Sequence, residues 1–292
     1  MSANAIELMK KYIPYLDVAY REGAATSVLD VPDQLAQAGK TARSVVVPVM
    51  DTDGLADYSR NGGYVRRGTN LKYEEYTYNY DRGGIFEVDS MDNAETDSVA
   101  FGSLAGRVMK DRVIPEMDAF RFATYASAAD VENSEGLLVT GEEAISALRA
   151  GMSYMDEQEV NSEGRILFIT PTLAGSIDDL DTTRSRKVFE GFSKVIKVPQ
   201  KRFYTGIDLL DGESENEIAG GYKKADGAAD INFMIIEKSA IIQHTKHSVN
   251  KIIDAAANQH ADAYMFFCRF YGLADVYKNR TAGIYVHHKP VV

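Results

Sequence analysis

The chain has 292 residues, of which 45% are hydrophobic and 26% are charged, a composition typical of globular proteins and not of disordered or fibrous ones. Its net charge of −11 argues against a dedicated nucleic-acid binder, because phosphate backbones are bound by positive surfaces. The single cysteine, Cys268, excludes an internal disulfide and a cysteine-based zinc cluster. No apolar stretch approaches the roughly 18 residues that span a bilayer, and the first residues do not resemble a signal peptide. We therefore expect a soluble protein that is made in the cytoplasm and has no membrane partner.

The first predicted element is an amphipathic helix near the start of the chain. Apolar residues recur at spacings of three and four, which places them in one stripe on a helical surface; they are Ile6, Met9, Ile13, Leu16 and Tyr20. The small and polar residues that follow, up to about residue 42, include a proline and predict an extended arm.

The next part of the chain predicts a long β-hairpin between about Val45 and Arg82. Its first strand, Ser44–Met50, contains Pro48, which requires a sheet edge or a bulge because proline donates no ladder hydrogen bond. The second strand, Leu71–Asp81, alternates like a strand but is rich in tyrosine and charge, so neither of its faces resembles a core face.

The hairpin turns at the glycine-rich tip, residues 61–63, and ends at Asp-Arg-Gly-Gly, residues 81–84, which we interpret as the hinge to the body. Hairpins are only marginally stable in water when isolated. This one therefore needs another surface to lie on, and we expect that surface to belong to a neighbouring subunit.

The remaining elements predict an α+β fold in which one long helix lies beside a long sheet. The Asp92 and Glu95 pair predicts a helix from about Asn93 to Ala128, with a kink or restart at Pro115. Further elements are a helix through about Glu157 after the capping box at Thr140, a buried strand over 165–170, a short helix over 172–180, strand-rich runs over 231–247, 261–277 and 283–288, and a connection over 248–260.

Common enzyme motifs are absent: the chain has no G-x-S-x-G, no Walker A and no G-x-G-x-x-G sequence. His244, His247 and His260 raise the possibility of a metal site. On a strand, however, positions 244 and 247 point to opposite faces, and no nearby carboxylate completes a ligand set. We therefore expect no enzyme activity, cofactor or metal, and keep a soluble metal-dependent hydrolase that uses His244, His247 and a carboxylate as the competing hypothesis.

Candidate functional residues gather on the predicted hairpin. Their charges alone fit a solvated hairpin surface, but the length of the arm and the tyrosines at period two favour an interface, because aromatic and arginine side chains are enriched at subunit contacts. The predicted intersubunit residues are Arg66, Arg67, Lys72, Glu74, Glu75, Tyr76, Tyr78, Tyr80 and Arg82.

Two segments, 63–96 ("GYVRRGTNLKYEEYTYNYDRGGIFEVDSMDNAET") and 113–126 ("VIPEMDAFRFATYA"), resemble the extended loop and spine helix of tailed-bacteriophage major capsid proteins. This is the Hong Kong 97-type capsid fold, which encapsulin shells share. Residues 231–247 and 258–287 resemble the long C-terminal strands and chain end of the same family. The resemblance covers nearly the whole chain and is weakest from about residue 178 to 227.

The resemblance implies a division of the chain into four parts. These are an N-terminal arm (1–43), an extended loop (44–82), a peripheral domain with the spine helix (83–136 plus 240–275), and an axial domain (137–239 plus 276–292). It also implies that subunits assemble as pentamers and hexamers into an icosahedral head in the host bacterial cytoplasm, so that the protein ends up in the virion. Double-stranded DNA would be enclosed with non-specific contacts only.

Some relatives carry an N-terminal scaffolding segment, whereas this sequence opens directly with arm-like residues. We therefore expect a separate scaffolding protein, together with a portal protein. The alternative within the same fold is an encapsulin-like compartment that encloses cargo enzymes. The sequence alone leaves that alternative open.

Overall fold

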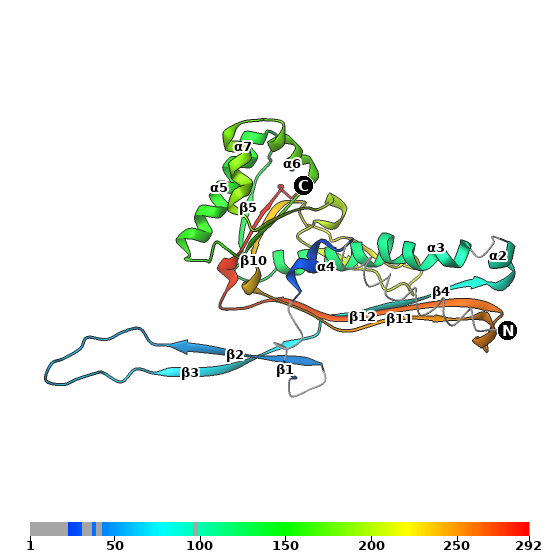
Figure 1. The fold of residues 1–292 in the computed structure, drawn as a ribbon, viewed down its shortest axis with the longest axis horizontal. Helices are drawn as coiled ribbons and strands as arrows, with labels where there is room; N and C mark the ends of the chain where they lie inside the picture. Colours follow the sequence, from blue (N-terminus) through cyan, green and yellow to red (C-terminus); the bar gives the residue numbers. More distant parts are fainter. Residues whose placement is uncertain (1–22, 31–36, 39–42, 96–98, 292) are drawn as a thin grey trace.

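The computed structural model describes residues 23–30, 37–38, 43–95 and 99–291. Figure 1 shows an upper lobe built on a five-stranded sheet, a flat three-stranded sheet beneath a long helix, and a hairpin that projects from the junction of the two. The helix predicted over residues 6–20 lies outside the described residues. Across the described residues, no helix combines the length and apolar character needed to cross a membrane.

The long helix is made of three consecutive pieces, α3 (Val99–Val108), a π-helical turn η3 (Met109–Val113) and α4 (Ile114–Ala126). Pro115 occupies the first turn of α4, where its missing N–H costs least, so the predicted restart at this proline is confirmed. The predicted start was wrong, because a separate helix, α2 (Ser90–Glu95), begins earlier. The carboxylate of Asp89, not Asp92, accepts the Met91 N–H at 2.8 Å.

The upper lobe contains the sheet β5-β13-β10-β6-β7. Its strands are β5 (Glu132–Glu135), β6 (Arg165–Ile169), β7 (Lys194–Lys197), β10 (Ile231–Glu237) and β13 (Ile284–His288). Every residue of β10 is buried. Met234 and Ile236 pack with Phe122 of α4, whereas Phe233 and Ile235 pack with helices on the other face. Residues 233–236 accordingly form an uninterrupted apolar run, as expected for a strand that is covered on both faces.

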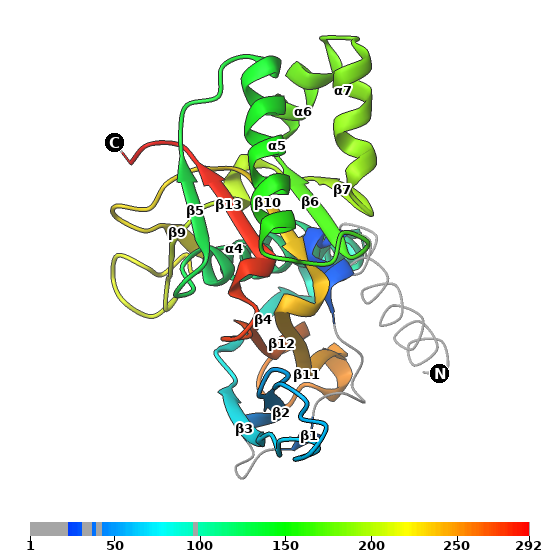
Figure 2. The ribbon, with the colours of Figure 1, turned by 90° about the vertical axis from the view of Figure 1, so that its left-hand side faces the viewer.

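The helices on that second face are α5 (Gly141–Glu157), α6 (Pro171–Asp178) and α7 (Thr183–Val188), and Figure 2 shows α5 in front of the sheet with α6 and α7 to its right. The capping box predicted at Thr140 is confirmed. The Thr140 hydroxyl accepts the Glu143 N–H at 3.3 Å, and the Glu143 carboxylate accepts the Thr140 N–H at 3.0 Å. Each donor would otherwise be unpaired at the helix start.

The other side of the long helix packs on the sheet β11-β12-β4. Its strands are β11 (Ile241–Ile253), β12 (Ala263–Val276) and β4 (Tyr80–Asp89). Phe266, Cys268 and Phe270 of β12 point into a cluster with Met109 and Met117 of the helix. The thiol of Cys268 is therefore buried, as predicted, and burial raises its pKa.

Two predictions about these strands were wrong. Residues 248–253, expected in a connection, continue β11 and pair with β12. Asp81–Gly84, expected as a hinge, lie inside β4, where they pair with residues 268–271 of β12. A β-carbon on Gly83 would meet the Cys268 carbonyl oxygen at 2.7 Å. The glycine therefore permits a close strand approach and does not mark a chain break.

Short elements complete the described chain. They are η1 (Ala25–Leu29), β1 (Gln37–Ala38), η4 (Phe189–Gly191), η5 (Gln200–Arg202), β8 (Ile207–Leu209), β9 (Tyr222–Lys224), η6 (Lys238–Ala240), η7 (Ala255–Ala257) and η8 (Thr281–Gly283).

His287 of β13 is a buried histidine inside the upper lobe, with 5% of its surface exposed. Its ring stacks on Phe233 with centroids 5.1 Å apart, and the amide of Asn232 donates to its Nδ1 over 3.0 Å. Burial, with a smaller contribution from His288, lowers the pKa of His287 to about 4. The folded protein therefore holds this ring in its neutral form.

We expect the protein to lose stability as the pH falls from about 6.5 to about 4. In this window the unfolded chain binds a proton at His287 that the folded chain does not bind, which favours unfolding by about 2–3 kcal/mol at the acid end. Denaturant unfolding across this pH range should show that His287→Gln lacks this part of the pH dependence. The exposed control His260→Gln should keep it, and identical pH profiles for the wild type and His287→Gln would contradict the assignment.

Candidate functional site: the hairpin arm and its root

The predicted hairpin is present as strands β2 (Ser44–Thr52) and β3 (Thr69–Thr77), which pair antiparallel along their full length. We call β2, β3 and the loop between them the arm. The short strand β1 pairs only with Val45 and Val46 of β2, so Pro48 lies at the edge of the described sheet, as predicted. The second strand ends at Thr77 and not at Asp81, so the arm is shorter at its base than predicted.

The loop at the end of the arm, residues 53–68, contains no strand, but its base is ordered by polar contacts. Asp53 and Gly68 exchange two hydrogen bonds, of 3.1 Å from the Asp53 N–H and 2.9 Å to the Asp53 carboxylate. Arg67 donates from Nε to the Gly54 carbonyl at 2.8 Å. The turn predicted at the tip is formed by Ser59 and Gly63, and Gly63 has a φ of +73°, a conformation that favours glycine.

Large apolar side chains along the arm are exposed to an unusual degree. The exposed fraction is 103% for Leu55, 89% for Tyr64 and 65% for Met50. Others are Tyr58, Val65, Leu71 and Tyr73. Large apolar side chains gathered on one exposed element indicate a site of interaction, and the described part of the chain provides no core for them.

The tyrosines at the base of the arm, residues 76–80, which we call the root, differ from those farther out because they pack against the same chain. Tyr76 is 3% exposed and lies in a cluster with Val45, Ile242 and Leu273. Its ring meets Tyr277 edge-on with centroids 5.8 Å apart. Burial, followed by the hydrogen bond that its hydroxyl donates to the Glu74 carboxylate at 2.7 Å, raises the pKa of Tyr76.

Tyr78 and Tyr80 also contact their own body. The Tyr78 ring stacks on Tyr271 with centroids 4.8 Å apart, and its hydroxyl is 3.1 Å from Nδ1 of His244. Tyr80 is 6% exposed and packs on Phe120 of α4 with centroids 5.0 Å apart. The structure thus differs from the expectation that these three rings await a neighbouring subunit.

The charged residues predicted for the interface fall into two groups. Arg66, Arg67, Lys72 and Glu75 are exposed on the arm, and Glu74 is half-buried beside Tyr76. Arg82 lies outside the arm, in β4, and its Nε donates to the Glu116 carboxylate of α4 at 2.8 Å. The arm and the body therefore hold different members of the predicted set.

Comparisons with known proteins bear on the fold. No family model matches the sequence, and no curated protein matches it. Among solved structures, the capsid of cyanophage P-SCSP1u has a TM-score of 0.58 at 12% identity and covers 90% of this chain and 87% of its own. A structure from Microbacterium phage Oxtober96 has a TM-score of 0.61 at 10% identity, covering 92% and 91%. A virus-like particle from Pyrococcus furiosus has a TM-score of 0.53 at 11% identity, covering 93% and 95%.

The chain has the phage capsid fold. This agrees with the fold class predicted from the resemblance, an α+β Hong Kong 97-type architecture. At these identities the likeness shows the fold alone, so the function needs its own argument.

Within this capsid fold, the segment that follows the arm, residues 78–81, makes contacts with β12 that sequence reasoning missed. The Asn79 side chain donates to the Ala274 carbonyl at 2.7 Å and accepts the Ala274 N–H at 3.1 Å, in the manner of a strand neighbour. Asp81 forms a paired contact with Arg269 at 2.8 and 2.7 Å, which lowers the pKa of the carboxylate. The partners of Asn79 and Asp81 are about 190 residues away along the chain. The local sequence showed polar residues alternating with tyrosines over 78–81, but it could not identify those partners.

The predicted orientation of His244 and His247 on opposite faces was wrong. They pair with Leu273 and Tyr271 respectively, with a register shift between Thr245 and His247. Because the bulge adds one residue, the two histidines lie on the same face of β11. No group of three potential metal ligands forms among the described residues.

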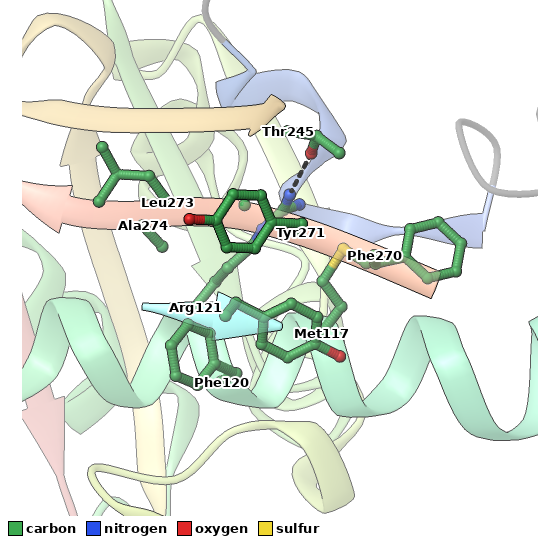
Figure 3. Close-up of a pocket in the computed structure, with 10 residues that line it drawn as sticks. Met117, Phe120, Arg121, Thr245, Phe270, Tyr271, Leu273 and Ala274 are labelled. Carbon is green, nitrogen blue, oxygen red and sulfur yellow. Dashed lines mark hydrogen bonds between the residues drawn. The ribbon is translucent and has the colours of Figure 1, made fainter. Parts of the chain in front are cut away.

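The cavity in Figure 3 lies between α4 and β12 and is lined by Met117, Phe120, Arg121 and Thr245, among others. The guanidinium of Arg121 points to the Thr245 hydroxyl at 3.4 Å. The cavity volume is about 10 Å³, which holds at most one water molecule. It is therefore a packing feature and not a substrate site.

Proposed function

We propose that the chain is a major capsid protein, a structural subunit that assembles into an icosahedral phage head. The observation that carries this proposal is the arm, which projects from the body (Figure 1). Leu55 and Tyr64 on its loop are almost fully exposed. The capsid fold supports the proposal. Catalysis is not part of the proposed role.

In this proposal the chain divides as the resemblance implies, into an N-terminal arm (1–43), an extended loop (44–82, whose last three residues begin β4), a peripheral domain (83–136 plus 240–275) and an axial domain (137–239 plus 276–292). The partners are other copies in hexamers and pentamers, a separate scaffolding protein and a portal protein. The shell encloses double-stranded DNA and forms in the host bacterial cytoplasm. The virion is the final location.

The mechanism is that each arm lies across a neighbouring subunit and buries the apolar side chains of its distal half. Arg66, Arg67, Lys72 and Glu75 supply polar contacts around that apolar centre. Each contact is weak, but a closed shell repeats it with every neighbour, which makes the assembly multivalent. A subunit must break several contacts at once to leave, so the shell persists through slow dissociation.

Replacing residues 53–68 with an Asn-Gly turn that joins Thr52 to Thr69 tests the proposal. The replacement keeps β2, β3 and the buried Tyr76, so we expect a soluble subunit with an unchanged unfolding midpoint. We also expect no shells by sizing chromatography and electron microscopy, because the most exposed apolar side chains of the arm, Leu55 and Tyr64, are removed with the loop. The double substitution Leu55→Ser and Tyr64→Ser should reduce the yield of shells without changing the length of the loop.

A matched control is the double substitution Leu137→Ser and Ile218→Ser, which removes two exposed apolar side chains outside the arm. This control should assemble normally. Shells of normal size from the loop replacement would refute the arm mechanism. Nuclease-protected DNA inside purified particles supports a phage head, whereas protein cargo would favour the encapsulin-like compartment.

A further inference from the structure

A groove of about 940 Å³ runs between the start of α4, strand β4 and the loops that carry η5 and β9; Figure 2 shows β9 beside α4. Its lining is strongly basic on a chain whose net charge is −11. Seven lining side chains are cationic: Arg82, Lys110, Arg112, Lys201, Arg202, Lys223 and Lys224. Three are carboxylates: Asp111, Glu116 and Asp211.

The floor of the groove is fixed by hydrogen-bonded ion pairs. Arg82 bonds to Glu116 at 2.8 Å and reaches the Gly221 carbonyl across the groove at 3.3 Å. Arg202 pairs with the fully buried Asp118 at 3.2 Å. These bonds join β4, α4 and the β8–β9 loop, so the groove is held open in a defined shape.

The rim carries cations that are not neutralised in this way. Lys110, Arg112 and Lys201 are exposed, and none of them forms an ion pair with another described residue. Lys110 and Arg112 belong to the π-helical turn η3, a rare local geometry that often occurs at functional sites. The rim is therefore a pre-formed set of positive charges that lack a partner within the described chain.

Aromatic rings form part of the same wall. Tyr222 donates from its hydroxyl to the Lys201 carbonyl at 2.7 Å, which holds η5 and β9 together. The Lys224 ammonium lies 5.6 Å from the centroid of the Tyr204 ring. The two rings therefore help to fix the positions of Lys201 and Lys224 in the wall of the groove.

We propose that this groove binds the phosphate backbone of a nucleic acid, with Lys110, Arg112 and Lys201 as the phosphate contacts. Ionised phosphate oxygens accept strong hydrogen bonds from arginine and lysine, and releasing their counterions drives binding. The rest of this acidic surface repels DNA, so the contact is confined to the groove. The proposal does not depend on shell formation, because the groove lies within one subunit.

The test measures binding of the full-length protein to a fluorescent DNA duplex of about 20 base pairs by anisotropy at low salt. We expect Lys110→Glu, Arg112→Glu and Lys201→Glu together to weaken binding by about tenfold or more. The matched control is Arg184→Glu, Lys187→Glu and Lys194→Glu, which changes the net charge equally at exposed positions outside the groove. This control should change affinity by about twofold or less.

The salt dependence gives a second readout. Three phosphate contacts predict that the logarithm of the association constant falls with the logarithm of salt concentration with a slope of about −3. The slope should approach zero in the groove variant and also in the neutral variant with glutamine at the same three positions, because neither variant neutralises a phosphate there. Thermal unfolding of each variant checks that the fold is intact.

Three results would overturn the proposal. The first is no measurable DNA binding by the wild type, and the second is an equal loss in the groove and control variants. The third is displacement of the duplex by inorganic tripolyphosphate at an equal phosphate concentration, which would indicate a site for a small phosphate ligand. Shell formation is scored separately by electron microscopy, so failure of this proposal is distinguishable from failure of the proposed capsid function.

Discussion

Replacing Asp118 with alanine is expected to lower the free energy of unfolding by about 3–5 kcal/mol. Asp118 is fully buried on α4. Its carboxylate accepts the N–H groups of Ala25 and Thr26 at 3.0 and 3.1 Å and the Thr26 hydroxyl at 2.7 Å, and it also pairs with Arg202. Without it, buried donors and one cation lose their partner, which is more costly than losing an exposed contact.

Equilibrium unfolding in urea measures this effect. Asp111→Ala, in the π-helical turn η3 and exposed, is the matched control and should change stability by about 0.5 kcal/mol or less. Asp118→Asn keeps the shape of the side chain but loses its charge, so it should fall between the two. A loss of under about 1 kcal/mol for Asp118→Ala would contradict the assignment of Asp118 as the anchor of residues 25–26.

The second large effect is expected at the root of the arm, where Tyr76→Ala should cost about 3–5 kcal/mol of stability. The substitution removes a buried ring from the cluster of Val45, Ile242 and Leu273, and it also removes the edge-on contact with Tyr277. Because this cluster joins the arm to β11 and β12, the arm should lose its fixed direction. We therefore expect a lower unfolding midpoint together with fewer and less uniform shells.

The variant Tyr73→Ala distinguishes an effect on the stability of the subunit from an effect on shell assembly. Tyr73 lies on the same strand as Tyr76 but is 64% exposed, so its removal should change stability by about 0.5 kcal/mol or less. Because Tyr73 belongs to the exposed apolar surface of the arm, its removal should reduce the yield of shells. If Tyr73→Ala and Tyr76→Ala lowered the unfolding midpoint equally, the division between buried root and exposed arm would be wrong.

The root of the arm also shows why local sequence was an incomplete guide to the site. Residues 73–80 alternate like a strand, and that periodicity correctly indicated extended structure. The partners of Tyr76, Tyr78 and Tyr80 come from β11, β12 and α4, far along the chain. A side chain that has no partner nearby in the sequence can still be buried by strands far along the chain. The sequence analysis therefore assigned Tyr76, Tyr78 and Tyr80 to an intersubunit contact, although they pack against their own chain.

Elements whose signals are local were predictable from sequence. The capping box at Thr140, the restart at Pro115 and the edge position of Pro48 each follow from the hydrogen-bonding capacity of one or two residues. The run over 165–170 was likewise predicted to be a buried strand, and every residue of β6 is buried. In each case the determining interaction lies within a few residues.

Only the tertiary structure decided features that depend on strand partners. Asp81–Gly84 form a strand because β12 lies alongside them, and the turn signal of Gly83 and Gly84 is overridden by that pairing. The shared face of His244 and His247 depends on a bulge, which changes the side-chain period at one position. The basic groove joins cations from four separate segments on a chain whose net charge is negative. Sequence thus determined the local conformations and the exposed character of the arm, whereas long-range packing decided which side chains are buried and which charges meet.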